Sequence, residues 1–148
     1  MKKIIISGLG GQGIKFCSIL LGKILSSLKY KTSLIISYDA AMSGGEIQTN
    51  IIYNKNEIEN LFFETPDLII LFSKKDLEKI SRNKKILKIY EIEVPEKFKK
   101  IKNIFYLGIL LKKLGLDINK IDLDKILREE NKEAIKSGYN NANQTQPQ

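Results

Sequence analysis

The sequence is poor in the residues from which most cofactor and catalytic sites are built. Its 148 residues include one cysteine, Cys17, and no histidine or tryptophan. A single thiol forms no internal disulfide, which favours a reducing, cytoplasmic compartment. It is also too few for an iron–sulfur cluster, which takes about four thiolates. Without histidine, Ser-His-Asp and Cys-His catalytic units are excluded, and we expect no metal site.

Long apolar runs are also missing. No stretch approaches the roughly 18 apolar residues that a membrane-spanning helix needs, so we expect no membrane partner. The first residues carry two lysines and only three consecutive apolar residues, Ile4 to Ile6. This pattern is typical of a strand rather than a signal peptide.

Arginine is scarce although the chain is basic. Lysine and arginine together number 25 against 17 acidic residues, a formal net charge of +8, but only Arg82 and Arg128 are arginine. A basic balance is compatible with nucleic acid, an acidic partner or an anionic ligand. The lysines are spread from Lys2 to Lys136 with no basic stripe interleaved with aromatics. We therefore expect no nucleic acid to bind.

Apolar periodicity predicts strands that alternate with helices. Strands are expected at 4–6, 33–37, 47–53, 68–72, 86–90 and 104–106. Helices are expected at 14–30, 73–83 and 107–114, the last capped by Gly115, with a final helix from Asp122 to about Ile135 that Gly138 ends. We predict a single domain over residues 1–138 and a flexible polar tail over 139–148.

The order of these elements predicts an α/β fold, a three-layer sandwich around a mixed, mostly parallel sheet. The connection between the second and third strands, Tyr38 to Glu46, spans only nine residues. A parallel crossover needs about a dozen residues or more, usually with a helix. We therefore expect these strands to be antiparallel neighbours, in a fold that is Rossmann-like but not a true dinucleotide-binding domain.

A glycine-rich turn follows the first strand and precedes the first helix. It matches G-x-G-x-x-G, and its candidate binding residues are Gly8, Gly10, Gly11, Gln12 and Gly13. Backbone N–H groups at such a turn, together with the helix dipole, form an anion site. A tight strand-to-helix turn that binds nothing explains the same residues. An NAD site would also want an acid after the second strand, and Asp39 lies near that place.

A second candidate loop follows the second strand. Its candidate binding residues are Ser37, Tyr38, Gly44 and Gly45. Loops at the carboxyl ends of strands hold ligands and partners in α/β sheets, and Tyr38 offers a flat ring with a hydroxyl tip. A long hairpin loop that needs glycine for its turn is the alternative.

Taken together, these motifs resemble one family. The segments Gly8–Ile14, Ser37-Tyr38, Gly44-Gly45 and Pro66–Leu71 are similar to the γ subunit of 2-oxoacid:ferredoxin (or indolepyruvate:ferredoxin) oxidoreductases. Asn103 to Gly108 is similar to a later segment of that family, and the resemblance runs from Ile4 to Gly138. The chain has Ser43 where the family usually has arginine and Asp39 where it usually has glycine, and its stretch 73–102 is short for the family.

The resemblance implies a multi-subunit enzyme that oxidatively decarboxylates a 2-oxoacid to an acyl-coenzyme A. Thiamine diphosphate would lie on α and β partner subunits, and iron–sulfur clusters on a cysteine-rich, ferredoxin-like δ subunit, with ferredoxin as electron acceptor. The γ part would lie near the coenzyme A region. This chain would bind no cofactor alone, supply no catalytic side chain and be inactive alone.

Two alternatives remain open from the sequence. One is a small module that binds NAD, FAD or coenzyme A, with Asp39 on a ribose and Gly10 to Gly13 under a diphosphate. The other is a stand-alone remnant of the family with a structural role, which the Ser43 departure and the short middle segment favour.

Overall fold

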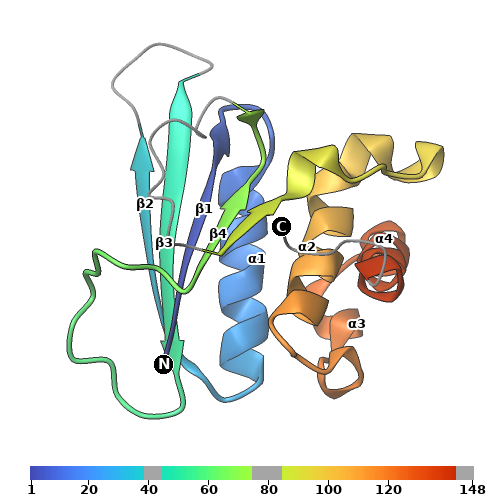
Figure 1. Cartoon of the computed structure of the whole chain (residues 1–148). Coiled ribbons are helices and arrows are strands. Elements are labelled where there is room, and N and C mark those ends of the chain that lie inside the picture. The colour runs from blue at the N-terminus through green and yellow to red at the C-terminus, as the bar shows by residue number, and fades with distance from the viewer. Residues whose placement is uncertain (39–44, 75–84, 143–148) are drawn as a thin grey trace. The chain divides into compact units, whose positions relative to one another are not determined.

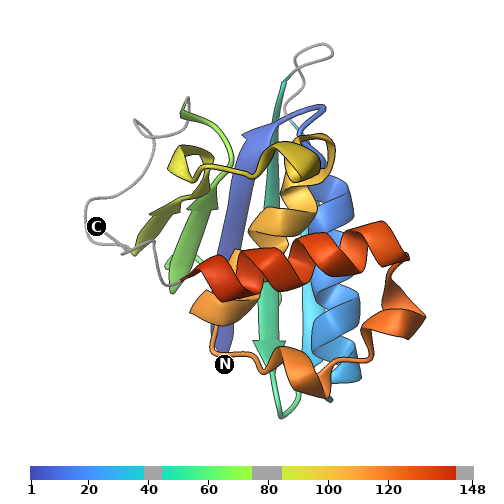
Figure 2. The ribbon, with the colours of Figure 1, turned by 90° about the vertical axis from the view of Figure 1, so that its right-hand side faces the viewer.

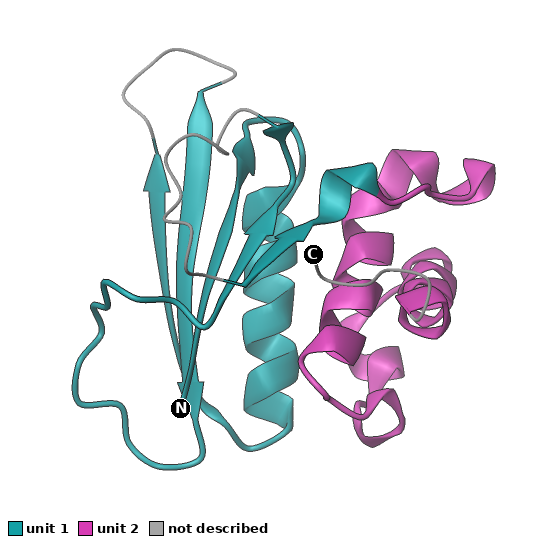
Figure 3. Cartoon of the chain, in the orientation of Figure 1, with its two compact units in different colours: residues 1–91, 147–148 teal, residues 92–146 magenta. Residues whose placement is uncertain are grey.

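The chain divides into two compact units. A computed structural model describes residues 1–38, 45–74 and 85–142. Unit 1 spans residues 1–91 and unit 2 spans residues 92–146 (Figure 3). The single domain expected over 1–138 therefore stays a prediction, and the helix predicted at 73–83 falls almost wholly outside the described residues.

Unit 1 is a sheet with one long helix, and unit 2 is helical. In unit 1 the elements are β1 (Lys2–Leu9), α1 (Ile14–Ser27), β2 (Lys31–Tyr38), β3 (Glu46–Asn54), β4 (Leu68–Leu71), β5 (Ile86–Lys88) and the 3-10 turn η2 (Ile89–Glu91). In unit 2 they are η3 (Glu96–Ile101), α2 (Lys102–Lys113), η4 (Ile118–Lys120), α3 (Leu123–Ile126) and α4 (Glu129–Asn141). No helix of the described residues is both long and apolar enough to cross a membrane.

The five-stranded sheet has the order β2-β3-β1-β4-β5. The β1–β4 and β4–β5 pairs are parallel, whereas β3 is antiparallel to both β1 and β2. Four strands therefore run in one direction and β3 alone opposes them, as the arrowheads in Figure 1 show. This arrangement confirms the predicted mixed, mostly parallel α/β sheet, and the antiparallel β2–β3 pair confirms what the short connection predicted.

The core of unit 1 forms where α1 packs against the sheet. The helix buries a stripe at helical spacing, and the strands meet it with their inward residues: Ile14, Cys17, Leu21, Ile24 and Leu25 from α1, and Ile4, Ile6, Ile51 and Ile70 from the strands. Two buried hydroxyls in this layer bind each other: the Ser18 hydroxyl donates to the Thr49 hydroxyl over 3.0 Å. Burial without a partner would have been costly for both hydroxyls.

The prediction of a short strand at 104–106 is wrong, because these residues lie within α2. Every residue from Ile104 to Leu111 is buried, so the run shows no exposed face. A continuous apolar run does not distinguish a buried strand from a buried helix. The expected cap at Gly115 is confirmed: its φ is 71°, and the Leu116 N–H donates to the Leu111 carbonyl over 3.0 Å.

The final helix differs from its prediction in two ways. It is two helices, because Leu127 is extended with φ −129° and ψ 151° between α3 and α4. Gly138 lies inside α4 instead of ending it, and residues 139–141, which we assigned to the tail, belong to this helix. The Tyr139 hydroxyl donates to the Leu116 carbonyl over 2.9 Å, which ties this last turn to the rest of unit 2.

Gly138 has a packing role that its sequence position did not reveal. In unit 2, α4 runs across α2 (Figure 2), and two glycines allow the backbones to touch. A Cβ on Gly108 would lie 2.1 Å from the Ile135 carbonyl oxygen, and one on Gly138 would lie 1.9 Å from the Phe105 carbonyl oxygen. Neither obstacle is a side chain that could rotate away, so the crossing requires glycine at both positions.

The substitution Gly138→Ala should therefore destabilise the protein by about 3 kcal/mol or more, above the usual cost of overpacking. The matched control is Gly22→Ala inside α1, where the new Cβ would meet only Leu34 Cδ1 at 3.7 Å. Because alanine is the better helix former, that control should stabilise by about 0.5–1 kcal/mol. Urea unfolding followed by circular dichroism measures both. Equal effects in the two variants would contradict the close helix crossing.

Candidate functional site

The two loops singled out in the sequence meet at one end of the sheet in unit 1. The strand register places Gly8, Ile47 and Tyr38 side by side across β1, β3 and β2. Beyond the strands, the Gly10 N–H donates to the Gly45 carbonyl over 2.9 Å. The structure thus brings the glycine-rich turn and the second loop together. Gly44 lies outside the described residues, as do Asp39 and Ser43.

Gly8 serves the packing of the turn. A Cβ there would lie 2.3 Å from Ile14 Cδ1, 2.6 Å from Gln12 Oε1 and 2.8 Å from Phe72 Cβ. The residue is buried, so nothing outside the chain reaches it. Its lack of a side chain allows the first residue of α1 to approach the ends of β1 and β4.

The Gln12 side chain fixes the shape of the turn. Its Oε1 accepts the Leu9 N–H over 2.7 Å, and its Nε2 donates to the Phe72 carbonyl over 3.2 Å. Phe72 in turn donates its N–H to the Ser7 carbonyl over 2.8 Å. The carboxamide therefore joins the end of β1 to the chain that leaves β4, which gives a physical reason for glutamine between the glycines. The role of Phe72 could not be predicted from its residue type, because its backbone carbonyl makes the contact.

Several amides of the turn are already used within the chain. Besides the Leu9 and Gly10 N–H groups, the Gln12 N–H donates to the Leu9 carbonyl over 3.3 Å. Gly11 differs: its φ is 86°, a Cβ there would meet nothing within 4 Å, and its N–H has no partner among the described residues. An anion at this turn would thus meet Gly11 before any of its neighbours.

The start of α1 adds to this open side of the turn. Gly13 is the N-cap, in the left-handed region with φ 73°, and no side chain caps the helix. The first turn contains no acidic residue that would repel an anion. A helix start without a side-chain cap, together with the helix dipole, favours negative charge at such a position.

The second loop contributes exposed side chains at the same end of the sheet. Tyr38 is 58% exposed, and Ser37 is exposed beside it at the end of β2. A ring held at a strand terminus and open to solvent offers a flat face with a hydroxyl at its tip. Of the predicted site residues, Gly11, Ser37 and Tyr38 therefore present free surface, while Gly8 and Gln12 hold the turn together.

The only cysteine is not available for chemistry. Cys17 lies in the core of unit 1, and burial raises the pKa of its thiol to about 12. A thiol is nucleophilic or metal-binding as the thiolate, which is disfavoured here. Within residues 1–38, 45–74 and 85–142, no group of three or more His, Cys, Asp or Glu side chains could hold a metal ion.

Comparison with known proteins places this geometry in context. A sequence model of the family described as pyruvate ferredoxin/flavodoxin oxidoreductase matches residues 3–92, which include both loops. Comparison with curated protein sequences finds no match.

Three solved structures share the fold. The first is 2-oxoglutarate:ferredoxin oxidoreductase from Magnetococcus marinus, solved with 2-oxoglutarate, coenzyme A and succinyl-CoA bound (TM-score 0.76, 17% identity). The second is the γ subunit of a keto/oxoacid ferredoxin oxidoreductase from Geobacter sulfurreducens (TM-score 0.70, 15% identity). The third is pyruvate oxidoreductase subunit PORC from Thermotoga maritima (TM-score 0.69, 19% identity). The similarity covers 99%, 98% and 94% of this chain, respectively. It covers only 32% of the Magnetococcus chain, but 100% of the Geobacter chain and 95% of the Thermotoga chain.

Replacing Gln12 tests its structural role. The substitution Gln12→Ala removes the two side-chain hydrogen bonds to the Leu9 N–H and the Phe72 carbonyl, which should cost about 2 kcal/mol of unfolding free energy. The control is Gln48→Ala, because Gln48 is exposed on β3 and its side chain donates to Asn50 Oδ1 in the same strand. That change should stay within about 0.5 kcal/mol. A loss in the control as large as that in Gln12→Ala would contradict the role.

The buried thiol predicts a loss of stability in alkali. The folded-state pKa of Cys17 is about 12 against an ordinary value of 9.0, so the unfolded chain releases this proton first. The contribution of this thiol to the free energy of unfolding is therefore fully present below pH 9 and is lost as the pH rises toward 12. Urea unfolding at a series of pH values should show this decline, with a shallower one in Cys17→Ala. A native thiol that reacts freely with an alkylating reagent at pH 8 would contradict its burial.

Proposed function

The chain belongs to the pyruvate ferredoxin/flavodoxin oxidoreductase family, and on this premise we propose that it is the γ-type subunit of a 2-oxoacid:ferredoxin oxidoreductase. Such an enzyme oxidatively decarboxylates a 2-oxoacid, transfers the acyl group to coenzyme A and passes the electrons to ferredoxin. The observation that carries the proposal is the family match over residues 3–92, the part of the chain in which the two loops are joined by the Gly10–Gly45 hydrogen bond.

The residues of this chain do not fit the redox cofactors of that reaction. Iron–sulfur clusters need several thiolates, whereas the sequence has one cysteine, which is buried with a raised pKa. In the proposal, clusters and thiamine diphosphate are therefore held by α, β and ferredoxin-like δ partner chains. This chain contributes backbone donors, exposed side chains and a docking surface.

The open end of the sheet fits coenzyme A better than any redox group. The uncapped start of α1 and the Gly11 amide, with no acidic residue in the first helical turn, suit the phosphates of that ligand. The exposed ring of Tyr38 suits stacking on its adenine. We therefore assign coenzyme A binding in the assembled enzyme to Gly11, Gly13, Ser37 and Tyr38, with Gly45 holding the second loop beside them.

The alternative of a stand-alone dinucleotide-binding module is less well supported. In a dinucleotide-binding domain the acid that holds the ribose follows the strand next to β1. Here β3 lies between β1 and β2, which moves the end of β2 away by one more strand spacing, about 4.8 Å. The amides of Leu9, Gly10 and Gln12, which a diphosphate would need, are also used within the chain.

Association with partner chains tests the proposal most simply. The tagged full chain, purified anaerobically from its native cells, should bring along a thiamine-binding pair and a cysteine-rich, ferredoxin-like chain in fixed proportions. Mass spectrometry identifies and counts them. A chain that is recovered alone under conditions that preserve such complexes would contradict the subunit role, and micromolar binding of NAD in calorimetry would then favour the alternative.

The role of Tyr38 is tested in the assembled enzyme. Loss of a stacked base costs about 1–3 kcal/mol, so Tyr38→Ala should raise the KM for coenzyme A about tenfold while the KM for the 2-oxoacid stays unchanged. The control Tyr38→Phe keeps the ring and should retain most of the affinity. If both variants match the wild type, the ring does not contact coenzyme A.

A further inference from the structure

The connection between β3 and β4 exposes apolar side chains on a segment with no regular secondary structure. In residues 55–67, Leu61 is 45% exposed and Phe62 is 73% exposed. Phe62 is the most exposed large apolar side chain in the described part of the chain. Two adjacent apolar residues at the tip of a loop, left in water by the fold of this chain, are typical of a surface that another molecule covers.

The two ends of this loop are fixed to unit 1. At the first end, Lys55 Nζ donates to the Leu28 carbonyl over 2.8 Å and lies 3.8 Å from the centre of the Tyr30 ring. At the other, the Asp67 carboxylate accepts the Lys3 N–H over 2.8 Å while the Asp67 N–H donates to the Lys3 carbonyl over 2.7 Å. The tip is thus presented from anchored ends, which lowers the entropy lost when a partner binds.

The tip itself carries a local turn. The Phe62 N–H donates to Asn60 Oδ1 over 3.0 Å, an Asx-type bond that sets the backbone just before the exposed ring. Pro66, near the end of the loop, is buried. The apolar residues are therefore displayed by a shaped loop, as in a preorganised binding segment.

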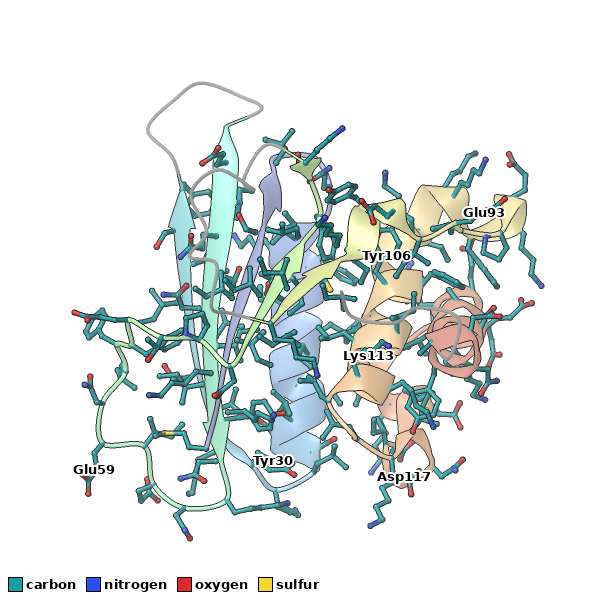
Figure 4. The ribbon with its side chains drawn as sticks, viewed as in Figure 1. Tyr30, Glu59, Glu93, Tyr106, Lys113 and Asp117 are labelled. Atoms are coloured by element: carbon teal, nitrogen blue, oxygen red, sulfur yellow. The ribbon has the colours of Figure 1, made fainter. Side chains whose placement is uncertain are left out.

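The loop is acidic although the chain is basic. Residues 55–67 contain three glutamates and one aspartate against one lysine, a net charge of −3, in a chain of net charge +8. Glu57 pairs with Lys31 over 3.3 Å and is itself highly exposed, and Figure 4 shows Glu59 pointing outward from the loop. An apolar tip with an acidic surround is complementary to an apolar pocket rimmed by lysine or arginine.

This surface is separate from the site formed by the glycine-rich turn. The loop leaves β3 beside the start of β1, where Tyr53 pairs with Lys2, at the opposite end of the strands from Gly8 and Tyr38 (Figure 1). A molecule docked on the loop would leave the proposed coenzyme A site open. The negative charge also disfavours nucleic acid and anionic membranes at this surface.

We propose that loop 55–67 docks this chain onto its thiamine-binding partner subunits, with Leu61 and Phe62 inserted into an apolar pocket that has a basic rim. The inference rests on the proposed function for the identity of the partner. A second copy of this chain is a poorer occupant, because an acidic loop bound to a different, basic face would form a head-to-tail contact, which gives a ring or an open filament instead of the common two-fold dimer.

The experiment compares two exposed phenylalanines of unit 1. Tagged full chains that carry Phe62→Ala or Phe16→Ala are expressed in native cells and purified anaerobically; Phe16 lies on α1 and is 53% exposed. Mass spectrometry measures the thiamine-binding pair recovered per tagged chain. Phe62→Ala should reduce recovery at least tenfold, as expected for the loss of a central anchor, while Phe16→Ala should not. Both variants should unfold at the wild-type urea midpoint.

A charge variant tests the acidic surround. Glu59→Lys should lower recovery of the pair and make the remaining association less sensitive to salt than that of the wild type. Unchanged recovery with Phe62→Ala, or equal losses with Phe16→Ala, would overturn the docking loop while the proposed function stands. If the wild-type chain recovers no thiamine-binding pair, the proposed function itself fails. An isolated chain that is a dimer, and that Phe62→Ala converts to a monomer, would assign the loop to a second copy instead.

Discussion

The insertion of β3 between β1 and β2 is the constraint on which the site depends. The connection between β2 and β3, residues 39–45, is seven residues long and too short for a crossover. The chain therefore turns back, and β3 pairs antiparallel with β2 on one side and β1 on the other. This return places Gly45 beside Gly10 and joins the two loops by a backbone hydrogen bond. It also separates the end of β2 from the glycine-rich turn by one strand, which makes a dinucleotide site of the usual geometry unfavourable.

In the glycine-rich turn, hydrogen bonds within the chain use several of the backbone N–H groups that would bind a phosphate in such a motif. Gln12 binds one strand end with its oxygen and another with its nitrogen, and Gly8 is glycine because three neighbours fill the space of a side chain. The surface that remains available to a ligand is small. It consists of the Gly11 amide, the uncapped start of α1 and the ring of Tyr38. The motif therefore positions a small exposed surface, which suits the proposed role of a subunit that shares its ligand with other chains.

Sequence patterns predicted the sheet and the first helix of unit 1 well because their signals are local. Short β-branched runs, one amphipathic helix and a connection of limited length were enough to predict the strands and the antiparallel return. Unit 2 was predicted less well, since the buried run from Ile104 to Leu111 has no exposed face and Gly138 was read as a helix end. The true role of Gly138, a backbone contact with Phe105, depends on residues that are distant in the sequence. The pairing of Gly10 with Gly45 and the bond from Gln12 to Phe72 were inaccessible for the same reason.

In the proposed function, this chain completes an enzyme without carrying its redox chemistry. The most direct measurement is the reduction of ferredoxin, dependent on a 2-oxoacid and coenzyme A, by the purified chain alone, by its partner chains without it, and by the recombined mixture. Full activity is expected only in the mixture. Activity of the isolated chain, or partner chains that are equally active without it, would contradict the central claim.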